Sequence, residues 1–437
     1  MDVIFERCAG LDIHQKDVWV CVRKLEPSGR VKKEVKRFGT MTADLLALAE
    51  WLKEHGVTHT AMESTGVLWK PVYNILEGVI PEVWLCNAQH MSNLPGRKTD
   101  VKDCEWIAQL MQHGLLQKSF VPPKTVRNLR DLTRLRASFE DDKTRLSNRI
   151  HKVLEDANIK LGAVASDILG VSGRAMLWKI IGGESDGAQL ATLAKGKLKS
   201  KTEKLSQALT GFVSQHHRML LRTLMEQVAT LEKSIAGLDE AIVAEMQAAD
   251  AAAAQEAASK VPDPAQEASA EKPPLPFMKA VEALSAILGI KQRNAENILA
   301  EIGTDMSHWK TDRHIVSWAG KCPGNNISAG KSMSGKTTKG NVWLGRALTQ
   351  SAWVSARSKK TFYGARYRRL AKRRGKQRAI VAVTNSMLKS IYHMLKTHTP
   401  YKELGPDHYH KDQKQLIRTA TRTLERLGYN VKLEPAA

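Results

Sequence analysis

Four acidic residues in the first quarter of the chain have the residue type and the setting that metal-dependent phosphoryl transfer requires: Asp12, Glu63, Asp100 and Asp103. Asp12 and Glu63 each close a short apolar stretch, so each carboxylate is predicted at the end of a buried strand. Asp100 and Asp103 lie three residues apart in a segment of helical character and share one face of its first turn. Such a set predicts oxygen ligands for two divalent cations about 4 Å apart, which would clamp the attacking and leaving oxygens of a phosphodiester.

For any one of these acids alone, a solvated or helix-capping carboxylate is the simpler interpretation. The four together, in this order on alternating strands and helices, favour a catalytic set. Neighbouring acids such as Asp17, Glu77 and Glu105 lack that combination, and we interpret them as surface charge.

The elements that must position these acids alternate in type along the chain. Strands are predicted over 7–12, 18–23, 31–38, 60–63 and 83–86, and helices over 42–55 and 68–76. Three strands in a meander, followed by alternating helices and strands, predict an α/β sheet of the ribonuclease H-like class. Because many activities use that architecture, the fold alone decides little about function.

The charge of the chain is concentrated at one end. Residues 1–118 hold 15 Lys and Arg against 15 Asp and Glu, whereas residues 276–437 hold 30 against 10. We therefore expect the C-terminal part to bind a polyanion and the carboxylate region to be neutral. Five cysteines without a CxxC pair predict reduced, structural thiols. No stretch approaches the roughly 18 uncharged apolar residues of a membrane span.

The middle of the chain is predicted to be helical. An apolar stripe runs over 126–154, and seven apolar residues from Leu221 to Ile242 alternate spacings of three and four. This repeat predicts a coiled coil or a long antiparallel hairpin, and it leaves open whether the partner helix belongs to the same chain. Residues 247–275 are rich in Ala, Glu and Pro and are typical of a linker that is helical at its start.

A segment rich in Gly, Ser, Asn and Lys spans residues 318–341 and contains no acid. Its composition predicts a flexible loop that faces phosphates, followed by a helix over 342–356. Ser328, Ser332 and Ser334 could each be a nucleophile or a hydroxyl that bonds the backbone, and chemistry alone does not choose among them.

Residues 357–378 carry 11 Lys and Arg and no acid, with Phe362, Tyr363 and Tyr367 interleaved. This pattern predicts phosphate neutralisation, with base stacking on the aromatic rings. The apolar segment 379–395 is predicted to be a helix that anchors the basic one.

Read together, these segments resemble the DEDD transposases of bacterial insertion sequences, of the insertion-sequence 110 type. The resemblance covers most of the chain and rests on six short motifs: Gly10-Leu-Asp12, Met62-Glu63-Ser-Thr-Gly66, Lys98-Thr-Asp100-Val-Lys-Asp103, Ala319-Gly-Lys-Cys-Pro-Gly324, Ser328-Ala-Gly-Lys331 and Lys339-Gly-Asn341.

The resemblance implies that Asp12, Glu63, Asp100 and Asp103 are the catalytic, metal-binding tetrad and that Ser328 is the nucleophile. It implies Mg²⁺ as the cofactor, with Mn²⁺ as an alternative, and a covalent phosphoserine intermediate with DNA. The expected partners are donor and target DNA, a non-coding bridge RNA encoded by the element, and further copies of the chain as a dimer that assembles to a tetramer. We expect a bacterial cytoplasmic protein that associates with the nucleoid and not with a membrane.

Thirteen basic residues are the predicted nucleic-acid ligands: Lys331, Lys336, Lys339, Arg346, Arg357, Lys359, Lys360, Arg366, Arg368, Arg369, Lys372, Arg373 and Arg374. The expected layout is a RuvC-like catalytic domain at 1–118, a helical coiled-coil region at 119–246, the linker at 247–275, a mainly helical serine-bearing domain at 276–398 and a tail at 399–437.

Two other functions fit parts of the pattern. A metal-dependent nuclease or Holliday-junction resolvase would use the carboxylates and water, without Ser328. A non-catalytic nucleic-acid-binding scaffold would use neither.

Overall fold

The computed structural model describes residues 2–64, 66–87, 100–259, 272–324, 326–328, 331–409 and 413–433. Its contacts divide the chain into two compact units, Met1–Val121 and Pro122–Ala437. In the described residues, no helix is long and apolar enough to cross a membrane.

The first unit is a five-stranded sheet in the order β3-β2-β1-β4-β5. Its strands and helices are β1 (Arg7–Ile13), β2 (Asp17–Leu25), β3 (Val31–Gly39), α1 (Thr42–Glu54), β4 (His59–Glu63), α2 (Trp69–Leu76), β5 (Glu82–Cys86) and α4 (Asp100–Gln112). The first three strands are antiparallel, and β4 and β5 run parallel to β1. This mixed sheet is consistent with the predicted ribonuclease H-like architecture, and each predicted strand and helix of this region is present.

Alternate residues of β1 enter different cores. Ala9 and Leu11 pack with residues of α1 and α2, whereas Cys8 packs with residues of α4 such as Ile107. The two faces of the sheet are therefore covered by different helices, with α4 on the face that Cys8 shares. All four cysteines of this unit are buried free thiols, as predicted for structural cysteines.

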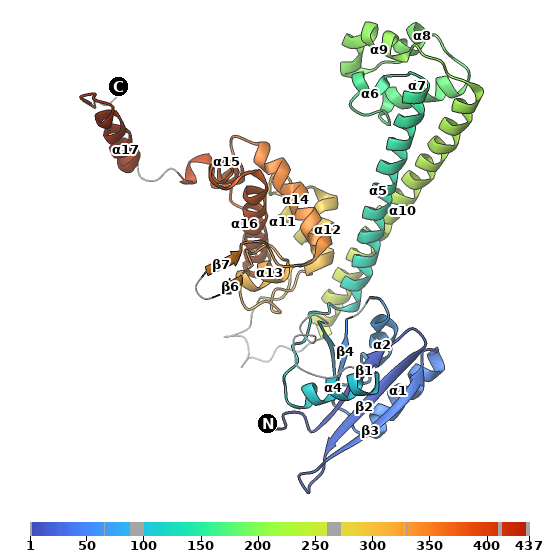
Figure 1. Cartoon of the computed structure of the whole chain (residues 1–437), viewed down its shortest axis with the longest axis vertical. Helices are drawn as coiled ribbons and strands as arrows, with labels where there is room; N and C mark the ends of the chain where they lie inside the picture. The colour runs from blue at the N-terminus through green and yellow to red at the C-terminus, as the bar shows by residue number, and fades with distance from the viewer. Residues whose placement is uncertain are drawn as a thin grey trace. The chain divides into compact units, whose positions relative to one another are not determined.

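The second unit begins with two long antiparallel helices, α5 (Lys124–Asp156) and α10 (Gln215–Ser259), which lie side by side (Figure 1). Leu146, Ile150 and Leu154 of α5 share a core with Leu221 and Val228 of α10. The apolar repeat of α10 is thus used within the chain. Between the two helices the chain forms a small helical cap: α6 (Leu161–Val164), α7 (Val171–Ile181), α8 (Gly187–Thr192), a 3-10 turn (Gly196–Lys201) and α9 (Thr202–Leu209).

The helix α10 continues to Ser259, into the segment predicted as a linker with a helical start. Both carboxylate oxygens of Asp250 accept from backbone N–H groups at the start of the next helix, those of Phe277 (2.5 Å) and Met278 (3.1 Å). The beginning of the linker therefore caps a helix of the C-terminal part.

The C-terminal part is mainly helical with one short pair of strands. Its elements are α11 (Phe277–Ser285), α12 (Gln292–Ile302), α13 (Asp312–Trp318), β6 (Asn326–Ser328), β7 (Lys331–Ser334), α14 (Val342–Arg357), α15 (Phe362–Arg374), α16 (Lys376–Thr397), a 3-10 turn (Pro406–Tyr409) and α17 (Gln413–Arg426). The apolar side of α16, including Ile380, Val383 and Met387, is buried. Tyr363 of α15 donates to the Ser390 hydroxyl of α16 (3.0 Å), so the two helices pack together as predicted.

Candidate functional site

Asp12 and Glu63 lie next to each other on one face of the sheet. In the parallel pairing of β1 with β4, Leu11 is opposite Met62, so the residues that follow them, Asp12 and Glu63, are neighbours across the strands. On β1, Asp12 lies on the same side of the sheet as Cys8, and on β4, Glu63 lies on the same side as Ala61. Cys8 and Ala61 both pack with α4. Because side chains alternate along a strand, both carboxylates belong to the α4 face.

The helix α4 runs antiparallel to β1, so its first turn meets the end of the strand that carries Asp12. The Cys8 thiol contacts the carbonyl of Ala108 (3.5 Å), and the Cα of Gly10 lies against the backbone of Cys104 and Ala108. A Cβ at position 10 would be 2.3 Å from the Ala108 nitrogen. Glycine is therefore required at position 10 for α4 to lie this close to the sheet.

The acids of α4 occupy its first turn. Asp100 is the first residue of the helix, and its side chain lies outside the described residues; Asp103 follows one turn later and is half-buried. Burial raises the pKa of the adjacent Cys104 thiol to about 12, and the nearby Cys21 and Asp12 act in the same direction. That influence on Cys104 is consistent with Asp12 lying beside the first turn of α4.

The sequence analysis missed His14, whose Nε2 lies 3.0 Å from the Asp12 carboxylate. His14 directly follows the end of β1, two residues after Asp12, a spacing that keeps side chains on the same side of an extended chain and could have indicated the contact. One ring nitrogen of His14 therefore contacts a carboxylate of the candidate site.

The carboxylate set fits a hard divalent cation in chemical type, because it offers oxygen ligands from two neighbouring strand ends and one helical turn. Among the side chains that the structure describes, which do not include Asp100, no three His, Cys, Asp or Glu lie close enough to hold a metal ion. The described geometry thus places Asp12, Glu63 and Asp103 at one region of the sheet without assembling a complete ligand set.

Ser328 lies on an antiparallel two-stranded arm, where sequence analysis predicted a loop. The strands β6 and β7 pair Asn326 with Ser334, Ile327 with Ser332, and Ser328 with Lys331. The side chains of the three candidate serines lie outside the described residues. Composition could not predict these strands, because their pairing depends on how the first and second halves of segment 318–341 are brought together in space.

The pairing continues toward the base of the arm. Pro323 forms an isolated bridge with Thr337, and the Gly324 N–H donates to the Lys336 carbonyl (2.8 Å). At the base, a Cβ on Gly340 would lie 2.3 Å from the Gly320 nitrogen, so the two segments that lead into and out of the arm need glycine to come this close. Ser328 is thereby at the far end of an arm whose base is near Gly320 and Gly340.

Two regions of the chain match families of known proteins. Residues 9–159 match a transposase family of the DEDD, IS110 type, and residues 281–368 match the transposase IS116/IS110/IS902 family. The chain belongs to the IS110 family of transposases. No curated protein matches the chain. The transposase is therefore a DNA-cutting and DNA-rejoining enzyme. Its four candidate acids fall in the first matched region and Ser328 falls in the second.

Ten of the thirteen predicted nucleic-acid ligands of the transposase are exposed: Lys331, Lys336, Lys339, Arg357, Lys359, Lys360, Arg369, Lys372, Arg373 and Arg374. The last four crowd the C-terminal half of α15, where they complement the negative end of the helix. These exposed cations leave the arm and α15 suited to a phosphate backbone.

The other three predicted ligands are partly buried and bonded within the protein. Arg346 forms a bidentate ion pair with Asp141 of α5, with both N···O distances 2.6 Å. Arg368 donates to the carbonyls of Ser358 (2.9 Å) and Lys359 (3.1 Å), and Arg366 donates more weakly to Ala382. A phosphate contact by Arg346 stays a prediction that requires its ion pair with Asp141 to open.

The prediction that bases stack on the aromatic residues of α15 is wrong for Tyr363. This residue is fully buried, its hydroxyl donates to the Ser390 hydroxyl (3.0 Å), and burial raises its pKa to about 12. Tyr367 packs edge-on against Trp353, and Phe362 against His408. These rings hold α15 against its neighbours because one side of a basic helix must still pack on a core.

Proposed function

We propose that the transposase cuts and rejoins DNA through Ser328, with a divalent cation held by Asp12, Glu63, Asp100 and Asp103. The single observation that carries the proposal is the division of chemistry in the chain. A neutral sheet gathers carboxylates at the ends of two neighbouring strands, and a separate basic part carries a serine on an arm with exposed lysines. Hydrolysis by water would need the carboxylates alone and would leave the serine arm without a role in the chemistry.

The proposed step exchanges one phosphodiester for another. The Oγ of Ser328 attacks phosphorus, an O–P bond forms, and the bond from phosphorus to one deoxyribose oxygen breaks. The proton that the serine hydroxyl loses is balanced by the proton that the leaving oxygen gains. Attack by a hydroxyl of a new strand reverses these changes, joins that strand and restores the serine. Because the number of phosphoester bonds is conserved, no external energy source is required.

The four acids would be the ligands of the cation. When bound, Mg²⁺ or Mn²⁺ supplies charge stabilisation to the transferring phosphoryl group. The neighbouring positions of Asp12 and Glu63 and the placement of Asp103 over the same face support this assignment. The contact of His14 with Asp12 would orient that carboxylate.

We further propose that an element-encoded bridge RNA pairs with donor and target DNA, so that base pairing selects the sites. The exposed cations of the arm and α15 would then hold backbone and not read bases. By this proposal the tetrad of one subunit acts with Ser328 of another in a tetramer. The proposed layout keeps a catalytic domain at 1–118, a helical region at 119–246, a linker at 247–275, a serine domain at 276–398 and a tail at 399–437.

The test uses purified protein, Mg²⁺, RNA transcribed from the DNA that flanks the coding region, and labelled donor and target DNA. On a denaturing gel we expect a covalent protein–DNA band that Ser328→Ala abolishes. Ser332→Ala and Ser334→Ala are matched controls from the same arm and should keep the band. Cleavage without a band, unchanged by Ser328→Ala, would establish hydrolysis by water and support the nuclease alternative.

A further inference from the structure

A buried carboxylate at the end of α12 connects the base of the serine arm to the long helix α5. Glu301 is 1% exposed. Its two oxygens accept from Nε and Nη2 of Arg134, both at 2.8 Å, in a bidentate pair. Nη2 of Arg130 donates to the Glu301 backbone carbonyl (2.5 Å), and Nε of Arg130 lies 3.4 Å from the Glu301 carboxylate. Two arginines, one turn apart on α5, thus hold one residue of α12.

The same carboxylate also binds the end of the serine arm. Nδ2 of Asn341 donates to Oε2 of Glu301 at 2.6 Å, while Oδ1 of Asn341 accepts from the Leu344 N–H at 3.0 Å. Asn341 is therefore the N-cap of α14 and directly follows Gly340, where the two strands of the arm come together. Both ends of its amide are used: the oxygen caps the helix and the nitrogen binds Glu301.

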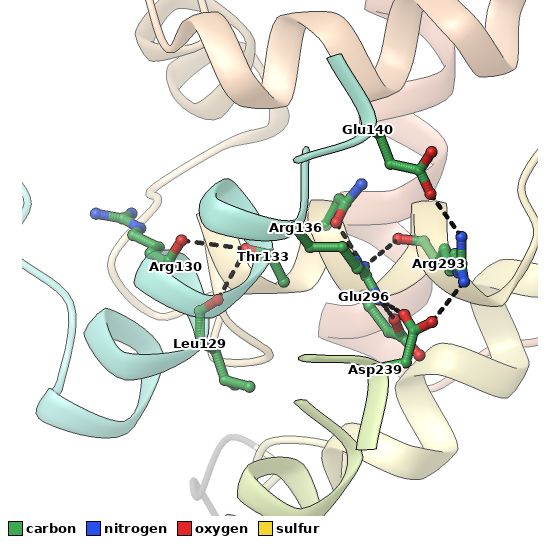
Figure 2. Close-up of polar contacts among 9 residues, drawn as sticks. Leu129, Arg130, Thr133, Arg136, Glu140, Asp239, Arg293 and Glu296 are labelled. Carbon is green, nitrogen blue, oxygen red and sulfur yellow. Dashed lines mark hydrogen bonds and ion pairs between the residues drawn. The ribbon is translucent and has the colours of Figure 1, made fainter. Parts of the chain in front are cut away.

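Glu296, one and a half turns earlier on α12, provides an internal comparison. It is 2% exposed and accepts from Arg136 of α5 at 2.6 Å. Figure 2 shows Arg136 bonded to both Glu296 and Asp239 of α10. Glu296 and Glu301 thus have the same charge, near-equal burial and an arginine partner on α5. They differ in that Glu301 has two arginine partners, Arg134 and Arg130, and in that Glu301 also binds Asn341 at the base of the arm.

We propose that Glu301 is a positioning residue for the DNA-joining reaction: through Asn341 it fixes the base of the arm that carries Ser328 relative to α5. This inference rests on the proposed role of Ser328. A nucleophile displaced by about 1 Å can lose about a hundredfold in rate. Loss of the fixed arm base should therefore lower the rate of adduct formation more than the affinity for DNA, because the exposed lysines can still contact phosphates when the arm moves.

The test compares Glu301→Gln, Asn341→Ser and the control Glu296→Gln in the full-length protein with its RNA and DNA. Glutamine keeps the shape of the side chain but removes its charge, and serine keeps an N-cap oxygen while removing the amide donor. At saturating DNA we expect Glu301→Gln and Asn341→Ser to form the covalent adduct about tenfold to a hundredfold more slowly. Their Kd for DNA and the adduct rate of Glu296→Gln should stay within about twofold of the unsubstituted protein.

The double variant Glu301→Gln/Asn341→Ser separates a shared effect from two independent ones. If Glu301 acts through Asn341, the double variant should be no slower than the slower single variant. Multiplied losses in the double variant, or equal losses in Glu301→Gln and Glu296→Gln, would overturn the proposal and leave Glu301 with a role in stability alone.

A second readout does not depend on the serine chemistry. Limited trypsin digestion should cleave Glu301→Gln and Asn341→Ser faster at Lys336 and Lys339 of the arm, relative to the exposed Lys199 of the helical cap in the same molecules. Glu296→Gln should keep the original ratio. If neither the unsubstituted protein nor any variant forms an adduct, but the difference in trypsin cleavage holds, the proposed role of Ser328 is wrong and the fixed arm base is retained. If the ratio is the same in all proteins, the positioning role is wrong.

Discussion

The helix α4 and the serine arm are each held by a neighbouring element, but through opposite chemistry. α4 lies on β1 through a glycine and apolar groups, with the backbone of Cys104 and Ala108 against Gly10. The base of the arm is held through buried charge, with Glu301 between Arg134 and Asn341. The first contact depends on shape, whereas the second depends on every charged partner being present.

This difference follows the charge of the two regions. The N-terminal region has as many acids as bases, so its functional acids can be placed by an uncharged scaffold. The C-terminal region carries a large excess of bases, and its buried acids each hold arginines in fixed positions. Substitutions should therefore disturb the two regions in different ways.

The largest effect is expected where chemistry alone is removed. Asp12→Asn keeps the size of the side chain but removes a proposed ligand charge, so strand cutting with Mg²⁺ should fall about 10²–10³-fold. Thermal unfolding should be nearly unchanged. Asp17→Asn is the matched control, because Asp17 also lies at a strand end but pairs with Arg37 at the surface. Equal loss in both variants would contradict the assignment of Asp12.

Removing one partner of a buried ion pair should lower the stability of the C-terminal unit substantially. Arg136→Met leaves Glu296 buried without its arginine, and we expect a loss of about 3–5 kcal/mol in the free energy of unfolding. Urea denaturation followed by circular dichroism measures it. The double variant Arg136→Met/Glu296→Leu should recover much of that loss. If the single variant is as stable as the double variant, the buried pair does not hold α12 as described.

These two predictions show what could and could not be inferred from sequence. The strands and helices of the first unit were predictable because one periodicity governs each apolar face, and the strand ends placed Asp12 and Glu63 correctly. Arg136 and Glu296 look like surface charge in the sequence, because only the pairing of α5 with α12 shows that each is the other's partner. The same limitation explains Tyr363, which stands in a basic run but faces the core.

An added methyl group should be enough to disturb the apolar contact. Gly10→Ala forces a Cβ to within 2.3 Å of the backbone of α4, which cannot yield as a flexible side chain could. We expect a loss of about 1–3 kcal/mol in the unfolding of the first unit, together with weaker metal-dependent cutting. Gly237→Ala is the control: it lies in α10, and apart from the adjacent backbone of the helix itself no atom lies within 4 Å of the added Cβ. That variant should be neutral or slightly stabilising.

The smallest effect should distinguish the regions by charge. Arg373→Ala removes one exposed cation from α15, so the slope of log K for DNA against log salt should become shallower by about 1. Lys53→Ala removes an exposed cation from α1 in the neutral region and should leave that slope unchanged. Filter binding at several salt concentrations compares the two variants. A shallower slope for Lys53→Ala alone would reverse the assignment of the DNA-binding surface.

The most direct test of the central claim is to find the residue that carries the DNA. The covalent adduct is trimmed with nuclease, digested with trypsin and analysed by mass spectrometry. Cleavage after Lys321, Lys331 and Lys336 places Ser328 as the only serine of the peptide 322–331, whereas Ser332 and Ser334 fall in the peptide 332–336. The account predicts the nucleotide mass on peptide 322–331. A nucleotide on peptide 332–336, or on neither peptide, would contradict it.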